Sequence, residues 1–316
     1  MKIKQIYQKA LELGIGADPR GRKGALRALE TQKKHYQGLS KLEKELFDKE
    51  KLKNPYADSR ILFGDPEKNI KTILAGIDIE VGEMLLAKEL GKIDLVLSHH
   101  PLGSALANLD EVMHLQADVL YEICGVPINI AEGVLKERIA QVKRGLAPVN
   151  HGQTVDAARL LKIPLMCAHT PIDNLVYQYV NKLIERKKPQ TMGEIIELLL
   201  KIPEYKQAAL NSAGPVIFAG ERNNRAGKIV VSEMTGGTNA NKEIYEKMSQ
   251  AGVGTIISMH MRDEHRKEAQ KYHLNVIVAG HIASDSLGLN LFLDELEKTG
   301  VKIIPCSGLI RIRRKK

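Results

Sequence analysis

The sequence predicts an α/β protein with two lobes, each a mixed sheet with helices on its faces, preceded by an extra helical segment at the N-terminus. From about residue 70 onward, short apolar runs alternate with longer amphipathic stretches, which is the pattern of strands and helices in turn. The chain has 316 residues, enough for two domains of ordinary size. Its hydrophobic content of 43% and charged content of 27% are those of a globular chain with a core, and they exclude a wholly disordered protein.

The N-terminal segment, residues 1–55, is expected to be helical. Ser40 followed three residues later by Glu43 is the pattern of a capping box, which marks the start of a helix. The glycine-rich and proline-containing stretch 16–24 predicts a turn between helical stretches. Pro55 predicts the end of the segment, because proline cannot continue a helix.

The rest of the chain divides into expected strands and helices. The expected strands are the apolar runs 71–79, 93–99, 164–169, 214–220, 228–233, 254–259 and 275–281. The expected helices between them include residues 82–91, 110–125, 173–186, 241–252 and 285–300. Residues 187–215 are interpreted as a connecting pair of helices. The expected units are therefore 1–55, 56–186 and 187–316.

The net charge of +9 is concentrated at the two ends of the chain. Residues 1–60 carry 15 basic and 8 acidic side chains, and residues 302–316 carry 6 basic and no acidic ones, which leaves the middle mildly acidic. Short basic ends are usually solvated, and no zinc-finger or RNP-like pattern accompanies them, so nucleic-acid binding is not expected. An aromatic content of 4% also argues against a surface that stacks bases.

The three cysteines, Cys124, Cys167 and Cys306, are far apart in the sequence and form neither a disulfide framework nor a CxxC zinc motif. This usage is typical of a reducing compartment. The N-terminus lacks a signal-peptide pattern, and no apolar run approaches the ~18–20 residues of a membrane span. We therefore expect a soluble cytoplasmic protein that does not associate with membranes.

Histidines stand at the ends of three expected strands. In open α/β sheets, chemistry gathers at the carboxyl ends of strands. His99 and His100 end the run 93–99, and adjacent side chains on a regular strand point to opposite faces, so they serve one site only if the chain bends there. Pro101 favours such a bend. The alternative is two strand-end histidines without a ligand role.

Two further motifs each pair a histidine with an aspartate four residues later. They are His169 with Asp173 and His281 with Asp285. On a helix, residues four apart share one face, so either pair is able to hold a cation. The alternative for each aspartate is a cap for the helix that follows.

Together, the three motifs offer both nitrogen and oxygen donors. Such mixed sets suit zinc, iron, manganese, cobalt or nickel. Five or six donors exceed the four of a closed structural zinc site. Two ions about 3.5–4 Å apart that share a carboxylate would use them all. The expected cofactor is therefore two divalent transition-metal ions per chain.

The motifs SHHPL, AHTPIDN and GHIASD, in this order, resemble the dinuclear-metal family of GTP cyclohydrolase I type 2 homologues, also called the NIF-three-like family or domain of unknown function thirty-four. The resemblance covers roughly residues 55–300. It implies a two-lobed α/β unit, often assembled as a hexameric ring with metal sites facing an inner cavity. It also implies a set of metal ligands, which are His99, His100, Asp173, His281 and Asp285.

The sequence departs from the family pattern at two places. The family usually has a metal-bridging glutamate where this chain has Asp285, which is shorter by one methylene, so bridging by this residue is left open. His169 matches a motif position that orients Asp173 or a bound water, and we assign candidate proton-transfer roles to His169 and Asp285. Where the family usually carries a Thr-Gly-Asp motif, this chain has His260 and His265. No ligand role is carried over there, and His265 is expected only near the pocket.

A glycine-rich turn, with Gly236, Gly237 and Thr238, lies between the expected strand 228–233 and the expected helix 241–252. Free N–H groups in such a turn are able to bind an anion such as a phosphate. The pattern is neither a Walker A loop nor GxGxxG. The alternative is a tight strand-to-helix turn.

The sequence therefore predicts a dinuclear metal-binding protein that acts as a metal-dependent hydrolase, of cyclohydrolase or phosphoesterase type, on a nucleotide-like small molecule or phosphoester. A non-catalytic metal chaperone, metal buffer or regulatory scaffold is the alternative. Nucleic-acid binding through the basic ends is a third hypothesis. A homo-oligomer, hexameric by resemblance, is expected.

Overall fold

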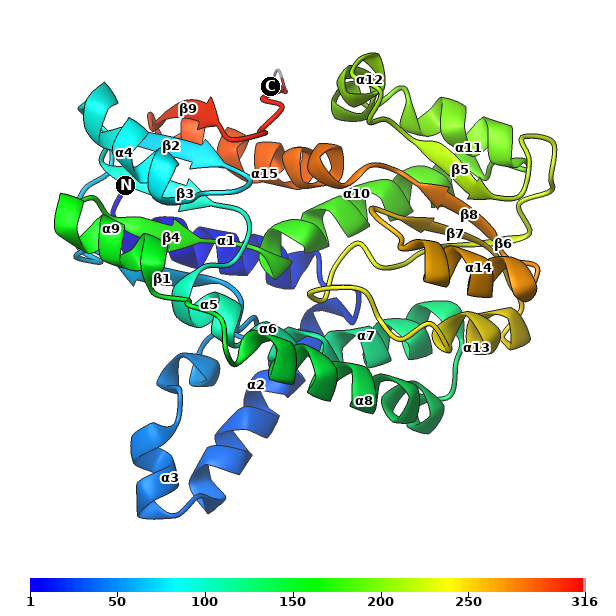
Figure 1. The fold of residues 1–316 in the computed structure, drawn as a ribbon, viewed down its shortest axis with the longest axis horizontal. Coiled ribbons are helices and arrows are strands. Elements are labelled where there is room, and N and C mark those ends of the chain that lie inside the picture. Colours follow the sequence, from blue (N-terminus) through cyan, green and yellow to red (C-terminus); the bar gives the residue numbers. More distant parts are fainter. Residues whose placement is uncertain (315–316) are drawn as a thin grey trace.

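The computed structural model describes residues 1–314, and within this range nine strands form two sheets surrounded by helices (Figure 1). The strands are β1 (Arg60–Phe63), β2 (Thr72–Gly76), β3 (Leu95–Ser98), β4 (Leu165–Cys167), β5 (Val216–Ala219), β6 (Lys228–Val231), β7 (Val253–Ser258), β8 (Asn275–Val278) and β9 (Lys302–Cys306). The predicted α/β class with two mixed sheets is confirmed.

Helices cover both sheets and connect their strands. They are α1 (Ile3–Gly16), α2 (Gly21–Gly38), α3 (Lys41–Leu46), α4 (Val81–Leu90), α5 (Gly103–Ala107), α6 (Leu109–Val112), α7 (His114–Val119), α8 (Ile128–Leu146), α9 (Gln153–Leu161), α10 (Thr170–Lys187), α11 (Met192–Leu199), α12 (Pro203–Leu210), α13 (Ile244–Gln250), α14 (Asp263–Lys271) and α15 (His281–Glu297). Two short helical turns are η1 (Lys49–Leu52) and η2 (Leu120–Cys124). No helix of the described part of the chain combines the length and the apolar composition that crossing a membrane requires.

The two sheets repeat one four-stranded arrangement. The first sheet has the order β1-β4-β3-β2-β9 and the second has the order β5-β8-β7-β6. In each, the first strand in the chain is antiparallel to its neighbour and carries an irregularity in register, whereas the next three are parallel. The strand β9 is added only to the first sheet, parallel to β2. Equivalent strand ends therefore exist in the two lobes.

Each of the seven predicted strand runs overlaps a strand, but β1 and β9 were not predicted. β9 contains Pro305, which lacks the N–H that a central strand needs, and it lies at the edge of the sheet. Its pairing with β2 brings residues 302–306 into the first sheet, although they fall within the expected unit 187–316. The expected connector contains α11 and α12. The unit boundaries themselves stay a prediction.

The N-terminal segment is helical as expected, but its parts differ in burial. α1 contributes the fully buried Ile3 and Ile6 to the core of the first lobe. α2 and α3 project from the body as a hairpin (Figure 1), and α3 has no buried residue. The predicted capping box is present, with the Ser40 backbone N–H donating to Glu43 at 2.8 Å.

The helices α10 and α15 lie side by side and place the two aspartates of the HxxxD motifs in one region. Gly288 on α15 makes this approach possible. A Cβ at this position would lie 2.5 Å from the carbonyl oxygen of Ile172 and 2.6 Å from the side chain of Val176, both on α10. The absence of a side chain at Gly288 thus lets the helices that carry Asp173 and Asp285 pack closely.

The basic C-terminal end is only partly solvated. Arg314 forms an ion pair with the fully buried Glu204 at 2.8 Å, and Arg311 forms ion pairs with Asp294 and Glu297. The last two residues of the RIRRKK end, 315–316, lie outside the described residues. The expectation of a solvated end is therefore wrong for Arg311 and Arg314, because carboxylates distant in the sequence pair with them.

Candidate metal centre

Three strand ends, two in the first sheet and one in the second, bring the histidine motifs together. His99 and His100 directly follow β3, His169 follows β4 and is the N-cap of α10, and His281 follows β8 as the first residue of α15. The ring centroid of His100 lies 5.7 Å from that of His169 and 5.3 Å from that of His281. The histidines that the sequence places at three strand ends therefore come together in one cluster.

The chain bends after β3 in the way that the adjacent histidines require. The Ser98 hydroxyl donates to the carbonyl of His100 at 2.7 Å, which closes a tight turn. The backbone N–H groups of His99 and His100 donate to the carbonyls of Gly76 and Ile77 at the end of β2. Both imidazoles consequently face the same cluster instead of opposite faces of the sheet.

The Nε2 atoms of the four histidines point at two buried aspartates. His99 Nε2 lies 3.3 Å from Asp173 Oδ1 and 3.5 Å from Asp285 Oδ1. Both His100 Nε2, at 3.4 Å, and His281 Nε2, at 3.5 Å, face the other oxygen, Asp285 Oδ2. Asp285 is thus surrounded by nitrogen donors on both of its oxygens.

The opposite ring nitrogen of three histidines is held by an oxygen acceptor. Nδ1 of His99 lies 3.1 Å from the Ala168 carbonyl, Nδ1 of His100 lies 2.6 Å from Asp78, and Nδ1 of His169 lies 2.8 Å from Asp58. An oxygen acceptor keeps the proton on Nδ1 and leaves the lone pair on Nε2. Metal-binding histidines usually have such a partner on the nitrogen that does not bind the metal.

Four buried polar atoms of this cluster have no hydrogen-bond partner anywhere in residues 1–314. They are His99 Nε2, Asp173 Oδ1 and both carboxylate oxygens of Asp285. A buried polar atom without a partner is costly, and it costs more when the group is charged. The donor atoms also form three overlapping sets, and within each set they all lie within 4.8 Å of one another. The sets are His99 with His100 and His169, His100 with His281 and Asp285, and His99 with Asp173 and Asp285.

These residues fit a transition-metal ion. The donors are imidazoles and carboxylates without a thiolate, which suits zinc, iron, manganese, cobalt or nickel. A cation among His99, Asp173 and Asp285, which form one of these sets, would give a partner to atoms that otherwise lie buried without a hydrogen bond.

The comparison with known proteins agrees with this architecture. No family model matches the chain, and no curated protein matches it either. Among solved structures, a NIF3 superfamily protein from Sphaerobacter thermophilus is 30% identical, covers 80% of this chain and 92% of its own, and superposes with a TM-score of 0.72. The chain belongs to the NIF3 superfamily. Reduced HcgD from Methanocaldococcus jannaschii shares the fold, with 15% identity, a TM-score of 0.51 and coverage of 78% of this chain and 87% of that one.

The electrostatics of this NIF3 centre favour positive charge. Burial disfavours the protonated form of His99, but the negative charges of Asp285 and Asp173 outweigh it and raise its pKa to about 10. For His100, Asp285 and Asp78 likewise overcome burial and raise the pKa to about 9. Burial alone would raise the pKa of Asp285, yet His99 and His100 hold it well below its ordinary range. Without a metal, protons supply the positive charge that the carboxylates require.

His281 differs from the other histidines of the centre. Burial is the largest influence on its imidazole and lowers its pKa, despite the opposing effect of Asp285. Its side chain remains 41% exposed, whereas that of His99 is fully buried. The centre therefore has a closed side at His99 and an open side at His281.

Two residues that support the centre were not found from the sequence. Asp58 is fully buried and accepts hydrogen bonds from both His169 and the Thr170 hydroxyl. Asp78 follows β2 and accepts from His100. Asp78 was a usable signal as the one charged residue near the end of the expected strand 71–79, whereas nothing near Asp58 in the sequence indicated its partner 111 residues away.

The remaining sequence candidates lie in the second lobe. His260 follows β7 and its ring centroid is 4.8 Å from that of His281, at the edge of the centre. His265 lies on α14 with Nδ1 3.2 Å from the Tyr245 hydroxyl, which in turn donates to Glu233. His265 thus belongs to a neighbouring polar cluster, and a place for it near the pocket stays a prediction.

The glycine-rich turn packs against helices of the first lobe. Gln116 on α7 donates to the carbonyls of Gly236 and Thr238 at 2.7 and 2.6 Å. A Cβ on Gly237, whose φ is +93°, would lie 3.2 Å from Met113 and from Val112. These contacts give a structural reason for the glycines, and phosphate binding by Gly236, Gly237 and Thr238 stays a prediction.

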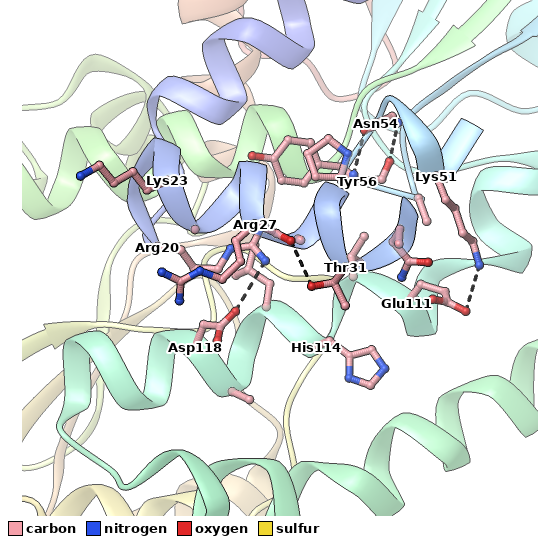
Figure 2. A pocket seen from close by; sticks show the side chains of 18 of the residues that line it. Arg20, Lys23, Arg27, Thr31, Lys51, Asn54, Tyr56, Glu111, His114 and Asp118 are labelled. Carbon is pink, nitrogen blue, oxygen red and sulfur yellow. Dashed lines mark hydrogen bonds and ion pairs between the residues drawn. The ribbon is translucent and has the colours of Figure 1, made fainter. Parts of the chain in front are cut away.

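A surface cavity of about 590 Å³, lined by none of the histidines of the candidate metal centre, lies at the base of the projecting hairpin (Figure 2). α2 lines one wall with basic side chains, and α6 and α7 line the other with acidic ones. Opposite charges already pair across it, Arg20 with Asp118 at 3.5 Å and Lys51 with Glu111 at 3.0 Å. These ion pairs therefore hold the hairpin against the body. The cavity does not contribute to the histidine cluster.

Proposed function

We propose that this NIF3 superfamily protein binds two divalent transition-metal ions per chain and acts as a metal-dependent hydrolase on a nucleotide-like or phosphoester substrate. The observation that carries the metal site is the set of buried, unpartnered atoms on His99, Asp173 and Asp285. A carboxylate with both oxygens buried and facing imidazole nitrogens is costly unless a cation joins them.

The ligands divide into two groups that share Asp285. His99 and Asp173 face Asp285 Oδ1, and His100 and His281 face Asp285 Oδ2. This division supports Asp285 as the residue that bridges the two ions, despite its shorter side chain. The close contact of α15 with α10 at Gly288 supports this role for the shorter side chain.

Two bound ions would lower the pKa of a bound water toward ~7 and stabilise a leaving oxygen. The proton-transfer role falls to His169, because both oxygens of Asp285 face nitrogen donors. The carboxylate of Asp58 holds the Nδ1 proton of His169, and His169 Nε2 faces the centre 3.5 Å from Asp173 Oδ2. His169 would accept a proton at Nε2 and return it to the leaving group.

Elemental analysis of the purified protein tests the metal site. The comparison needs wild type, the double variant His99→Ala/His100→Ala, and the control His114→Ala, which changes an exposed histidine outside the cluster. We expect about two transition-metal ions per chain in wild type and control, and their loss in the double variant. Absence of metal in wild type, even after reconstitution, would refute the site.

Turnover separates the hydrolase from a metal buffer, a metal chaperone or a regulatory scaffold. Metal-loaded protein should release product from nucleotides or simple phosphoesters, and His169→Ala should reduce kcat by about 10²–10⁴-fold without loss of metal. Metal that exchanges readily without any turnover across the screen would instead support the buffer or scaffold.

The proposal includes a homo-oligomer, hexameric as in the family, and a cytoplasmic location. The three cysteines of the chain, Cys124, Cys167 and Cys306, are free thiols, which supports a reducing compartment. Light scattering on the metal-loaded protein measures the assembly directly.

A further inference from the structure

His260 occupies the place in the second lobe that His100 occupies in the first. Each histidine lies two residues beyond the serine that ends the equivalent strand, β3 or β7. The Ser98 hydroxyl donates to the carbonyl of His100 at 2.7 Å, and the Ser258 hydroxyl donates to the carbonyl of His260 at 3.0 Å. The same turn therefore presents both imidazoles.

The turn after β7 directs His260 to the open side of the centre. Its ring meets the edge of the His281 ring at a centroid distance of 4.8 Å and an interplanar angle of 69°. His281 in turn lies 5.3 Å from His100. His260 is only partly buried, and it is absent from the sets of donor atoms that converge within 4.8 Å. It thus stands beside the proposed ligands at the accessible rim.

The hydrogen bond at Nδ1 distinguishes the two histidines. His100 Nδ1 faces the carboxylate of Asp78, which only accepts, so the proton stays on Nδ1. His260 Nδ1 instead faces the side-chain amide nitrogen of Asn239 at 2.9 Å. An amide nitrogen only donates, so Nδ1 of His260 accepts and the proton of the neutral imidazole lies on Nε2.

The orientation of the Asn239 amide is determined by a second acceptor. The same nitrogen donates to Glu233 Oε1 at 3.3 Å. Glu233 is itself held by the hydroxyl of Tyr245, which donates to Oε2 at 2.7 Å, and by the backbone N–H of Ala240. If the Asn239 amide were flipped, its oxygen would face the Glu233 carboxylate, and two acceptors would oppose each other.

Charges of both signs lie next to the residue that orients His260. Arg138 Nε donates to the backbone carbonyl of Asn239 at 3.0 Å, and the Glu233 carboxylate accepts from its side-chain amide. The Nε2–H group itself therefore decides what His260 binds, because an N–H donor suits a negatively charged oxygen and cannot coordinate a metal ion.

We propose that His260 binds an oxyanion of the substrate, a phosphoryl oxygen, through its Nε2–H group beside the metal centre, and that Asn239 is the positioning residue that selects this tautomer. The substrate class rests on the proposed function. The tautomer does not, and the two are measured separately.

Nuclear magnetic resonance of protein labelled with ¹⁵N-histidine reads the tautomer directly, in the metal-free and the zinc-loaded protein. His260→Ala assigns the signals. We expect the proton on Nε2 of His260 in both forms and, in the zinc-loaded protein, on Nδ1 of His100. A proton on Nδ1 of His260 would overturn the inference, whether or not the protein binds metal.

Titration calorimetry of zinc-loaded protein with inorganic phosphate tests the donor role. His260→Ala should keep the full metal content and weaken phosphate binding about tenfold or more, as loss of a hydrogen bond to a charged group does. Asn239→Asp should have a similar effect, because a carboxylate draws the proton to Nδ1. His114→Ala, an exposed histidine elsewhere, should leave the affinity unchanged.

Two results would contradict the donor role. Loss of metal in His260→Ala would make His260 a ligand, and unchanged phosphate affinity in a variant that keeps its metal would show that His260 does not contact the anion. If wild type fails to bind zinc, the proposed function fails, and the tautomer measurement still decides the assignment of His260.

Discussion

The end of β3 in the first lobe and the end of β7 in the second are closed by the same serine-to-carbonyl hydrogen bond, but they carry imidazoles of opposite character. At the first, the Asp78 carboxylate holds a proton on Nδ1 of His100, and Nε2, the nitrogen available to a metal, faces the buried carboxylate of Asp285. At the second, the Asn239 amide donates to Nδ1 of His260, which leaves an N–H at Nε2. The partner of Nδ1, and not the strand end itself, therefore decides whether a histidine here suits a metal or an anion.

The largest expected effect concerns the residue on which the first-lobe histidines converge. Asp285→Ala should remove both ions, a loss of affinity of at least about 100-fold, because Asp285 faces His99 and His100 through separate oxygens. Asp285→Glu, which restores the carboxylate usual in the family, should keep both ions. Elemental analysis gives the answer, and an Asp285→Ala protein that retains two ions would remove Asp285 from the centre.

Replacement of the carboxylates that accept a hydrogen bond from Nδ1 of the histidines should have a smaller effect than loss of Asp285. Asp78→Asn should weaken metal binding only about 10-fold, because it removes the acceptor that holds Nδ1 of the proposed ligand His100, but the Asp78 side chain is 60% exposed and water replaces it. Asp58→Asn should leave the metal bound and lower kcat, because the fully buried Asp58 holds Nδ1 of His169, the proposed proton-transfer residue. Competition with a chelator measures the metal affinities, and steady-state kinetics measure kcat. A larger loss of metal affinity in Asp58→Asn than in Asp78→Asn would contradict the separation of His169 from the metal ligands.

A change at the contact between α10 and α15 comes next and should lower the stability of the fold. Gly288→Ala introduces a Cβ 2.5 Å from the Ile172 carbonyl, so α10 and α15 must separate, at a cost of about 1–3 kcal/mol in the free energy of unfolding. Gly82→Ala on α4 is the matched control, because nothing lies within 4 Å of its Cβ. Urea denaturation compares the two. Equal stability of both variants would show that the helices do not depend on this glycine.

The pH dependence of the metal-free protein should give the smallest effect. The pKa values of His99 and His100, about 10 and 9, exceed the ordinary 6.5, so their protonation stabilises the fold. This contribution is complete below about pH 6.5 and is lost as the pH rises toward 9–10. The melting temperature of metal-free protein should therefore fall by a few degrees over this range.

The double variant His99→Ala/His100→Ala should lack this slope. Bound metal should reverse the pH dependence of the melting temperature, because neutral imidazole is the form that binds metal and a higher pH favours that form. Identical pH profiles for metal-free wild type and the double variant would contradict the assigned cause.

Local sequence patterns predicted the strands with continuous apolar runs and the motifs whose residues lie close together in the sequence. His169 with Asp173 and His281 with Asp285 were visible because each pair lies within one helical turn. β9 was not visible, because Pro305 interrupts its apolar run and its pairing with β2 depends on residues far away in the chain.

Contacts between distant segments account for the remaining differences. Asp58 acts on a histidine 111 residues away, and the Arg314 pair with Glu204 joins segments 110 residues apart. The character of His260 depends on Asn239, which the sequence shows only as the end of a glycine-rich turn. Such partners come together only in the folded chain, so no fixed spacing in the sequence indicates them.

Anomalous diffraction from crystals of the zinc-loaded protein would locate the metal ions among these side chains. We expect two anomalous peaks about 3.5–4 Å apart, one beside His99 and Asp173 and the other beside His100 and His281, with Asp285 between them. A single peak, or none among these residues at full zinc loading, would contradict a dinuclear centre bridged by Asp285.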